Sequence, residues 1–366
     1  MIILVDKKAI ELLKELCEAF GPAGFEREVS RIVKEHVKSY ADEITTDKLG
    51  SVVFKHRGDA GRPRVLLAGH VDEVGFVVSG IDEKTGFLTF NPLGGWWDQV
   101  LLTQRVTIRT RKGDVPGVIA AKPPHLLSPE DLKKVVEKTF MYIDVGASSK
   151  KEAEEMGIRM GDPVIPWSPF SLIRNKKIAM GKAFDDRIGA FIAMEVVRRL
   201  KENKIKHPNT VFGAATVQEE VGARGAITVA HVVDPDVAII IEVDIAGDVP
   251  GIKAYEAPAK MGKGPSILTF DSTMIPNQLL KDFVINTAEE MKIPYQLSQV
   301  AKGGTDAGKI HISRAGCPSI VISVPTRHIH SHVGLLSLKD TENAIKLTIE
   351  LVKRFNGEVV KGFTSL

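Results

Sequence analysis

The sequence predicts an α/β protein with a mixed sheet flanked by helices and a small β-rich domain inserted into it. At 366 residues the chain is too long for one ordinary compact core, so two domains are expected. Over most of the chain, long apolar runs alternate with segments of helical periodicity. From residue 74 to 170, short alternating strands between turn residues replace that pattern. Residues 1–73 and 171–366 are therefore expected to form one α/β domain, with residues 74–170 as a compact barrel-like module.

The α/β elements follow from periodicity and from capping or turn residues at their ends. Apolar runs bounded by turns predict buried strands, and apolar residues at helical spacing predict amphipathic helices. The predicted strands comprise residues 51–54, 64–70, 210–217, 237–243 and 319–324. The predicted helices begin after Asp6 as N-cap, after Gly24, at Ala183, near Asn277 and near Ser337.

In the insert, four short strands and two helices are expected. The strands comprise residues 75–79, 86–90, 105–109 and 117–120. One helix is predicted to open at Ser128-Pro129-Glu130, because proline favours the first turn, and another covers residues 151–156. Trp96 and Trp97 are either core residues or an exposed contact patch.

Composition excludes several classes of protein. A net charge of +3 is small for this length and argues against nucleic-acid binding. Cys17 and Cys317 are too few for a disulfide framework, and both are expected in the core. The N-terminus shows no signal-peptide pattern, and no apolar run approaches the length of a membrane-spanning helix. A cytoplasmic protein without membrane partners is expected.

Polar residues that end apolar runs suggest a metal site. Carboxylates and imidazoles follow several separate segments, where ligands collect in open α/β sheets. These residues are His70, Asp72, Asp185, Asp186, Glu219, Glu220, Glu242, Asp244 and His330. Histidine and carboxylate without thiolate suit Zn²⁺, Co²⁺ or Mn²⁺. The set is large enough for two ions if one carboxylate bridges them, and a further carboxylate must take a proton from the shared water.

Strand geometry separates the roles of neighbouring polar residues. Glu219 and Glu220 are adjacent and point to opposite faces, so they are not expected to do the same job. His70 and Asp72 share a face. Asp72 can accept a hydrogen bond from the non-ligating nitrogen of His70, or approach the site from its edge.

Several motifs, in order along the chain, resemble the tetrahedral aminopeptidases. These self-compartmentalised di-metal exopeptidases include glutamyl and deblocking aminopeptidases, and some members are labelled endoglucanases. The matching motifs span residues 68–75, 122–125, 183–187, 217–222, 304–307 and 325–331. The resemblance implies a di-zinc exopeptidase fold with a PDZ-like inserted barrel for dimerisation, short peptide substrates and a homododecamer.

The resemblance also implies a ligand set for two divalent ions, zinc or cobalt with manganese possible. His70, Asp185 and Glu242 would hold one ion. Asp185, Glu220 and His330 would hold the other, with Asp185 bridging the pair. The position of Glu242 is more often aspartate in the family, and Asp244 on the same side of the strand is the rival ligand.

Further roles are implied for the remaining polar residues. Glu219 would be the general base, Asp72 would support His70, and the Asp185–Asp186 bond is a candidate cis peptide. His125 would lie near a subunit contact, or it is a turn residue.

Three other features of the motifs are left without a metal-binding role. His328 and His332 are expected to be exposed loop residues. Residues 304–306 are expected to shape the substrate pocket, and Asp306 is not expected to bind a metal ion.

An aminopeptidase acting on short peptides is the function this sequence favours. The nearest alternative is a related di-metal carboxypeptidase or N-acyl amidohydrolase, which would prefer a blocked amine. Paired carboxylates also occur in glycosidases, but that function would leave His70 and His330 unused. A scaffold protein that kept only the fold would fail to bind two metals.

Overall fold

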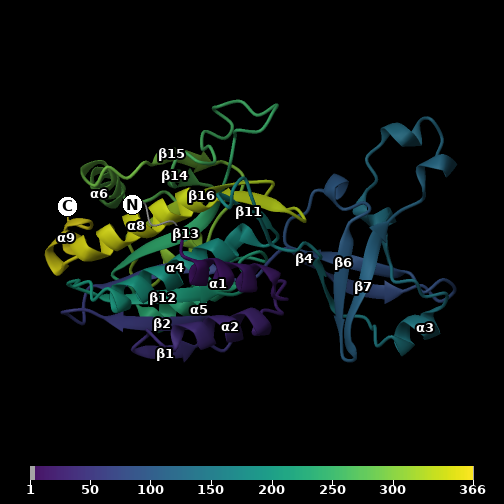
Figure 1. Cartoon of the computed structure of the whole chain (residues 1–366), viewed down its shortest axis with the longest axis horizontal. Coiled ribbons are helices and arrows are strands. Elements are labelled where there is room, and N and C mark those ends of the chain that lie inside the picture. The colour runs from purple at the N-terminus through teal and green to yellow at the C-terminus, as the bar shows by residue number, and fades with distance from the viewer. Residues whose placement is uncertain (1–4, 366) are drawn as a thin grey trace.

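The computed structural model describes residues 5–365. Residues 1–4, on which the signal-peptide expectation partly rests, lie outside the described residues. Figure 1 shows a helix-covered sheet at the left and a separate barrel at the right. The predicted fold class, a mixed α/β sheet with an inserted β-barrel, is confirmed. No helix within residues 5–365 combines the length and apolarity needed to cross a bilayer.

The central sheet has the strand order β1-β2-β12-β3-β13-β16-β17-β11-β10, and β14 and β15 extend it beside β16. Its strands are β1 (Glu43–Thr46), β2 (Val52–Arg57), β3 (Arg64–His70), β10 (Ser171–Ile173), β11 (Ile178–Gly181), β12 (Thr210–Thr216), β13 (Val237–Ile245), β14 (Ser266–Asp271), β15 (Gln296–Val300), β16 (Ser319–Arg327) and β17 (Gly334–Ser337). The helices of this part are α1 (Lys7–Glu18), α2 (Arg27–Val37), α4 (Phe184–Glu202), α5 (Arg224–Val233), α6 (Gln278–Glu290), α7 (Ala307–Ile310), α8 (Leu338–Arg354) and α9 (Gly357–Gly362).

Four adjacent strands, β12, β3, β13 and β16, run parallel. His70 is the last residue of β3 and lies opposite Thr216, the last residue of β12. Glu242 of β13 lies opposite Ser323 of β16. The carboxyl ends of these strands therefore meet at one edge of the sheet, which is the usual place for a ligand.

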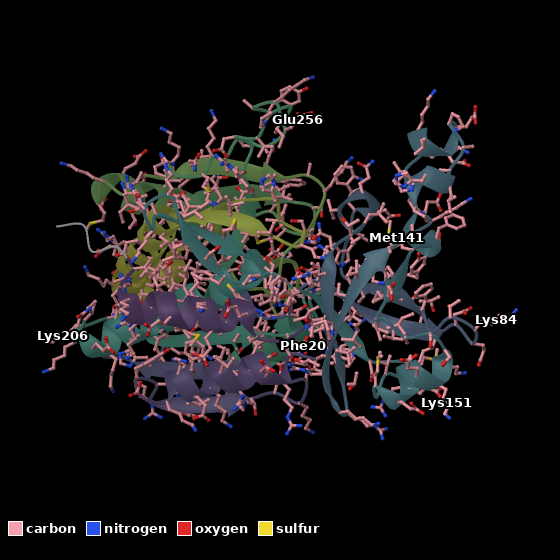
Figure 2. The ribbon with its side chains drawn as sticks, turned by 45° about the vertical axis from the view of Figure 1, so that its right-hand side comes forward. Phe20, Lys84, Met141, Lys151, Lys206 and Glu256 are labelled. Carbon is pink, nitrogen blue, oxygen red and sulfur yellow. The ribbon has the colours of Figure 1, made fainter. Side chains whose placement is uncertain are left out.

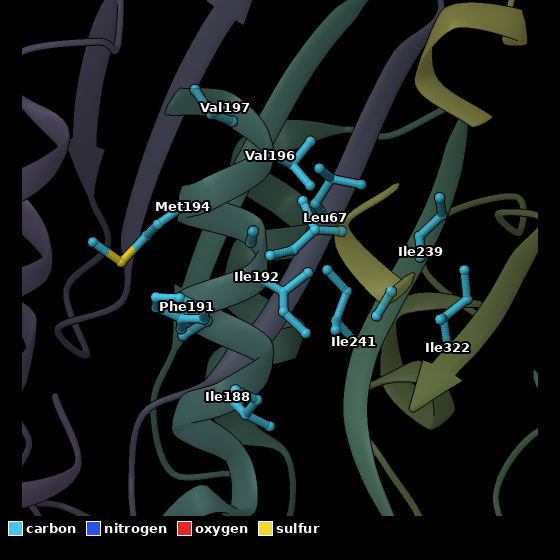
Figure 3. Packing of buried hydrophobic residues seen from close by; sticks show 14 of the residues in the cluster. Leu67, Ile188, Phe191, Ile192, Met194, Val196, Val197, Ile239, Ile241 and Ile322 are labelled. Atoms are coloured by element: carbon cyan, nitrogen blue, oxygen red, sulfur yellow. The ribbon is translucent and has the colours of Figure 1, made fainter. Parts of the chain in front are cut away.

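Alternate residues of the parallel strands pack on opposite faces of the sheet. Leu67 of β3 and Ile241 of β13 belong to the larger core, under α1, α2, α4 and α8. Leu66 belongs to a second core with α5 and α7. Figure 3 shows Ile188 and Ile192 of α4 packed toward the first of these faces. Because both faces are covered, these strands are continuous apolar runs in the sequence.

The insert forms a closed barrel with the order β4-β5-β8-β7-β6-β9, in which all pairs are antiparallel. Its elements are β4 (Gly75–Ile81), β5 (Leu88–Leu93), β6 (Arg105–Thr110), β7 (Gly113–Ala120), β8 (Tyr142–Asp144), β9 (Pro163–Pro166) and α3 (Lys150–Glu155). Domain boundaries at residues 74 and 170 stay a prediction.

One expectation for the insert is corrected, and one open alternative is resolved differently for its two residues. Where a helix was predicted to open at Ser128, the structure has only a short 3-10 helix, Asp131–Lys133, and the hydroxyl of Ser128 accepts the N–H of Asp131. The tryptophans divide: Trp96 is buried and donates to the carbonyl of Gly75, whereas Trp97 is 63% exposed.

The barrel contacts the helices of the sheet through a cation–π pair and an ion pair. The Arg109 guanidinium of β6 lies 4.0 Å from the ring centre of Phe20 and also pairs with Glu28 of α2. Figure 2 labels Phe20 at the junction between the two parts. These contacts connect the barrel to α2 and to the segment between α1 and α2.

Candidate metal centre

The polar residues expected at the strand ends surround one cavity. His70, Asp185, Glu219, Glu242 and His330 all line a cavity of about 570 Å³ at the carboxyl edge of the parallel strands. His70 ends β3, Glu219 follows β12, Glu242 lies in β13 and His330 follows β16. The structure thus brings together residues from five distant segments.

Asp185 lies between the two histidines. One carboxylate oxygen is 3.1 Å from Nε2 of His70, and the other is 3.2 Å from Nε2 of His330. Its backbone has non-helical torsions at the start of α4, and the Asp185–Asp186 peptide bond is cis, as suspected from the sequence. A carboxylate that directs one oxygen to each side is suited to bridge two ions.

Each histidine is oriented through its other ring nitrogen. Nδ1 of His330 donates to the carbonyl of Gly95, at 2.7 Å, and Gly95 belongs to the insert. Nδ1 of His70 donates to the backbone carbonyl of Asp72, at 3.1 Å. Both bonds leave Nε2 pointing at Asp185, which is how ligating histidines are held.

The bond expected from His70 to the Asp72 carboxylate is only a loose contact, at 3.5 Å. The two carboxylate oxygens of Asp72 instead accept the backbone N–H groups of Glu219 and Glu220, each at 3.0 Å. The spacing of two residues predicted that Asp72 lies beside His70. It could not predict that the backbone N–H groups after β12 also bond to Asp72. Asp72 thus supports both His70 and the loop after β12.

Buried carboxylates crowd the centre and disfavour each other's ionised forms. Burial raises the pKa of Glu220 to about 8, and the neighbouring charge of Asp185 adds to this. Burial, with nearby carboxylates, also raises the pKa values of Glu219 and Glu242 well above their usual range. The clustered negative charge is what bound cations would neutralise.

The histidines and the central aspartate shift in the opposite sense. Burial disfavours a charged His330, but its hydrogen bond to Asp185 raises its pKa to about 10. Burial likewise opposes ionisation of Asp185, yet its hydrogen bonds to His330 and His70 hold its pKa well below the usual range. These shifts favour protonated His330 beside ionised Asp185.

The donor set fits divalent metal ions. Ligand atoms of His70, Asp185 and Glu220 lie within 4.8 Å of one another, as do those of His70, Asp186 and Glu242. Oε1 of Glu220 is buried and has no hydrogen-bond partner among residues 5–365. An unpaired buried carboxylate oxygen in a cluster of imidazole and carboxylate is what a metal ligand requires.

Glu242 and Asp244 differ in what their carboxylates contact. Oε1 of Glu242 lies 3.8 Å from Nε2 of His70. Asp244 accepts a hydrogen bond from the hydroxyl of Ser266, at 2.6 Å, and stands outside the possible metal clusters found in residues 5–365. Of these two carboxylates, that of Glu242 is the one that lies beside His70.

The neighbouring histidines lie in different environments. His328 is exposed, as expected, but His332 is buried, contrary to the expectation of an exposed loop residue. The ring of His332 packs on Trp96, with centroids 5.4 Å apart, and burial lowers its pKa to about 4. His332 is buried because its ring packs on Trp96 of the insert, although the loop around it is polar.

Sequence reasoning missed a buried ionic group behind the centre. Glu73 accepts hydrogen bonds from Lys182, at 2.6 Å, and from Arg187, at 2.9 Å. Arg187 also donates to the backbone carbonyls of Leu16, Ala19, Gly21 and Val71, and is fully buried. Charged residues that bridge segments resemble surface residues in a sequence, so only the fold reveals them.

Comparisons with known proteins agree with this geometry. The profile of the M42 glutamyl aminopeptidase family matches residues 50–347. The chain belongs to the M42 peptidase family. This M42 peptidase is therefore an enzyme that hydrolyses peptide bonds, in a family that depends on metal ions.

Relatives share nearly the whole length of this M42 peptidase. The TET aminopeptidase of the marine sediment archaeon Thaumarchaeota archaeon SCGC AB-539-E09 is 66% identical, with a TM-score of 0.96 over 98% of this chain and 99% of that one. The putative aminopeptidase FrvX of Escherichia coli (strain K12) is 39% identical over 97% of this chain and 98% of its own. The TET1 peptidase of Pyrococcus horikoshii, which can assemble into a tetrahedron or a large octahedral shell, is 31% identical, with a TM-score of 0.84 over 95% of this chain and 100% of that one.

Proposed function

We propose that this protein is a di-metal aminopeptidase that removes N-terminal residues from short peptides, with Glu219 as general base. The observation that carries the proposal is Asp185, whose two oxygens each lie near one histidine. Aminopeptidase relatives that match almost the full length support the choice among peptidases.

The contacts of the two histidines support a ligand set for two ions. His70, Asp185 and Glu242 would hold one ion, and Asp185, Glu220 and His330 would hold the other. Zinc or cobalt, with manganese as a third choice, suits imidazole and carboxylate donors. When bound, such ions polarise a carbonyl and lower the pKa of a water molecule.

Glu219 is placed to move protons in this reaction. Its Oε2 lies 3.9 Å from Nε2 of His70, and the residue lines the cavity where a substrate would enter. Burial raises the pKa of Glu219, which favours a carboxylate that takes up a proton. Glu219 would take the proton of the attacking water and give it to the leaving amine.

The test compares Glu219→Gln with Glu220→Gln, the same chemical change one residue further on. Glu219→Gln should lower kcat by about 10²–10⁴-fold, the usual contribution of a general base. Both ions should remain bound in this variant, whereas Glu220→Gln should lose one. Activity assays and metal analysis measure the two effects. Metal loss from Glu219→Gln, or full turnover, would contradict the assigned role.

Free and N-acetylated aminoacyl anilides separate this function from the carboxypeptidase or amidohydrolase alternative. An aminopeptidase requires the free amine, whereas a deacylase prefers the blocked one. Cleavage restricted to the acetylated series would replace the proposal with the alternative.

We also propose a cytoplasmic homo-oligomer, a dodecamer built from dimers, in which residues 74–170 provide the dimer contact. The shells formed by the Pyrococcus horikoshii relative support assembly of many copies. Trp97, Leu126 and Phe140 of the insert are large apolar side chains that are more than half exposed, as an interface would require.

A further inference from the structure

Glu26 is a buried carboxylate outside the proposed ligand set that nevertheless contacts the loop after β12, which holds Glu219. It immediately precedes α2 and is 4% exposed. Its side chain makes no capping bond to its own helix. One oxygen, Oε1, instead accepts the backbone N–H of Gly24, at 2.7 Å, and of Gln218, at 3.1 Å.

The second of these bonds falls on the residue before Glu219. Gln218 has a φ of +57°, in the left-handed region that residues other than glycine seldom adopt. Such a conformation persists only where its surroundings hold it. Here the surroundings include Glu26 on the Gln218 N–H and Asp72 on the next two N–H groups.

Three successive amides of the loop after β12 are thus held by two buried carboxylates from different segments. Asp72 follows β3, whereas Glu26 belongs to the N-terminal segment. That segment lies beside the residue after Asp72, since Glu73 donates its N–H to Gly21 and accepts from Ala23. The geometry of the loop therefore depends on the N-terminal segment as well as on the sheet.

We propose that Glu26 is a positioning residue for the reaction: its carboxylate fixes the backbone of Gln218 so that the Glu219 side chain faces the metal centre. This inference rests on the proposed role of Glu219. Burial raises the pKa of Glu26 to about 7, which means that the ionised form of its side chain is disfavoured at this position. A carboxylate retained there is consistent with a role in placing Glu219.

The experiment measures kcat, KM and metal content for Glu26→Ala, Glu26→Gln and Glu219→Gln. Misplacing a catalytic group by about 1 Å can cost about 100-fold, so Glu26→Ala should lower kcat by about 10–100-fold. Its KM should stay within about threefold and both ions should remain bound, because the ligands are unchanged. Glu26→Gln should recover most of kcat, since an amide oxygen of the same reach can accept both N–H groups.

Glu28, in the first turn of α2 and two residues from Glu26, provides the matched control. Its carboxylate accepts the N–H of Phe20 and pairs with Arg109, but makes no bond to the loop after β12. Glu28→Ala should lower Tm without lowering kcat. An equal loss of kcat in Glu28→Ala would show that Glu26 acts only through the general stability of this region and would overturn the inference.

Two further readouts separate this inference from the proposed function. If Glu26 acts through Glu219, the double variant Glu26→Ala/Glu219→Gln should be no slower than Glu219→Gln alone. Hydrogen exchange of the segment 217–223 should accelerate in Glu26→Ala and remain unchanged in Glu28→Ala. Turnover retained in Glu219→Gln would overturn the function; an inactive Glu219→Gln beside a Glu26→Ala with wild-type kcat would overturn only the inference.

Should Glu26→Ala fail to fold, Glu26→Asp replaces it. Aspartate keeps the charge but withdraws the oxygen by one methylene. Positioning predicts that kcat of Glu26→Asp falls below that of Glu26→Gln by about tenfold or more. Equal kcat values, or the reverse order, would overturn the inference.

Discussion

At the residue scale, the carboxylates around the cavity differ in the groups that their oxygen atoms contact. Asp185, Asp72 and Glu26 are all buried or nearly so, yet they contact different groups: imidazoles, two amides, and two other amides. Carboxylates in one region of the fold can therefore have different proposed roles, because each contacts different atoms.

Glu242 and Asp244 offer a test of ligand identity. Loss of a residue that only hydrogen-bonds to a metal ligand typically lowers metal affinity by about 10–100-fold. Glu242→Ala should lower it further, because this change removes a proposed ligand oxygen. Asp244→Asn should keep both ions, because its oxygen can still accept from Ser266. Metal titration of the two purified variants measures the difference. The opposite order of affinities would make Asp244 the ligand.

At the scale of elements, α4 approaches the sheet through glycines. A Cβ on Gly69, next to His70, would lie 2.3 Å from the backbone nitrogen of Ala190. A Cβ on Gly189 would lie 2.2 Å from the carbonyl oxygen of Ile241. The absence of these methyl groups lets α4 place Asp185 beside His70.

Gly69→Ala should therefore destabilise the protein and weaken metal binding together. Overpacking of this kind costs about 1–3 kcal/mol, and a shifted α4 moves Asp185 away from His70. Gly357→Ala in α9 is the control, because its Cβ would meet nothing within 4 Å. Thermal unfolding and metal titration compare them. A Gly69→Ala protein as stable as the control would refute the close-packing argument.

The parallel strands could be predicted from the sequence because each is an apolar run with both faces buried. Polar residues at the ends of these strands also come together as predicted, with His70 and Glu242 in contact. Their role as metal ligands stays a prediction. Asp6 was also correct as an N-cap, accepting the N–H of Ala9.

Elements without a strong pattern could not be predicted. Strands β10, β11 and β17 have three or four residues each, too few to show a period. Glu26 could not be recognised either, because its partner Gln218 is 192 residues away and contributes a backbone amide. Backbone amides carry no sequence signature.

At the scale of the whole molecule, the folding stability of the protein should fall with rising pH once metal ions are removed. The folded pKa of Glu220 is raised from 4.5 to about 8, so its stabilising contribution in the metal-free protein is complete below 4.5 and lost as pH rises through 8. The pKa of His330 is raised from 6.5 to about 10, so its contribution is lost in the same direction, between 6.5 and 10. Chelated protein should therefore lose stability from pH 6 to pH 9.

The metal-loaded protein should change less over this range, because bound cations hold the ligands in their deprotonated forms. The difference in Tm between loaded and chelated samples should widen with pH, as thermal unfolding at several pH values would show. Chelator presaturated with calcium serves as the control. A difference that narrows toward pH 9 would be incompatible with the carboxylate cluster described here.

Through the carbonyl of Gly95, the barrel orients one of the two histidines of the cavity. This carbonyl accepts the hydrogen bond from Nδ1 of His330, and Gly95 belongs to the insert. A minimal enzyme trimmed to its sheet would therefore release that imidazole to rotate, however well the sheet itself folded. Substitutions that alter the surface of the barrel must therefore leave the peptide carbonyl of Gly95 in place.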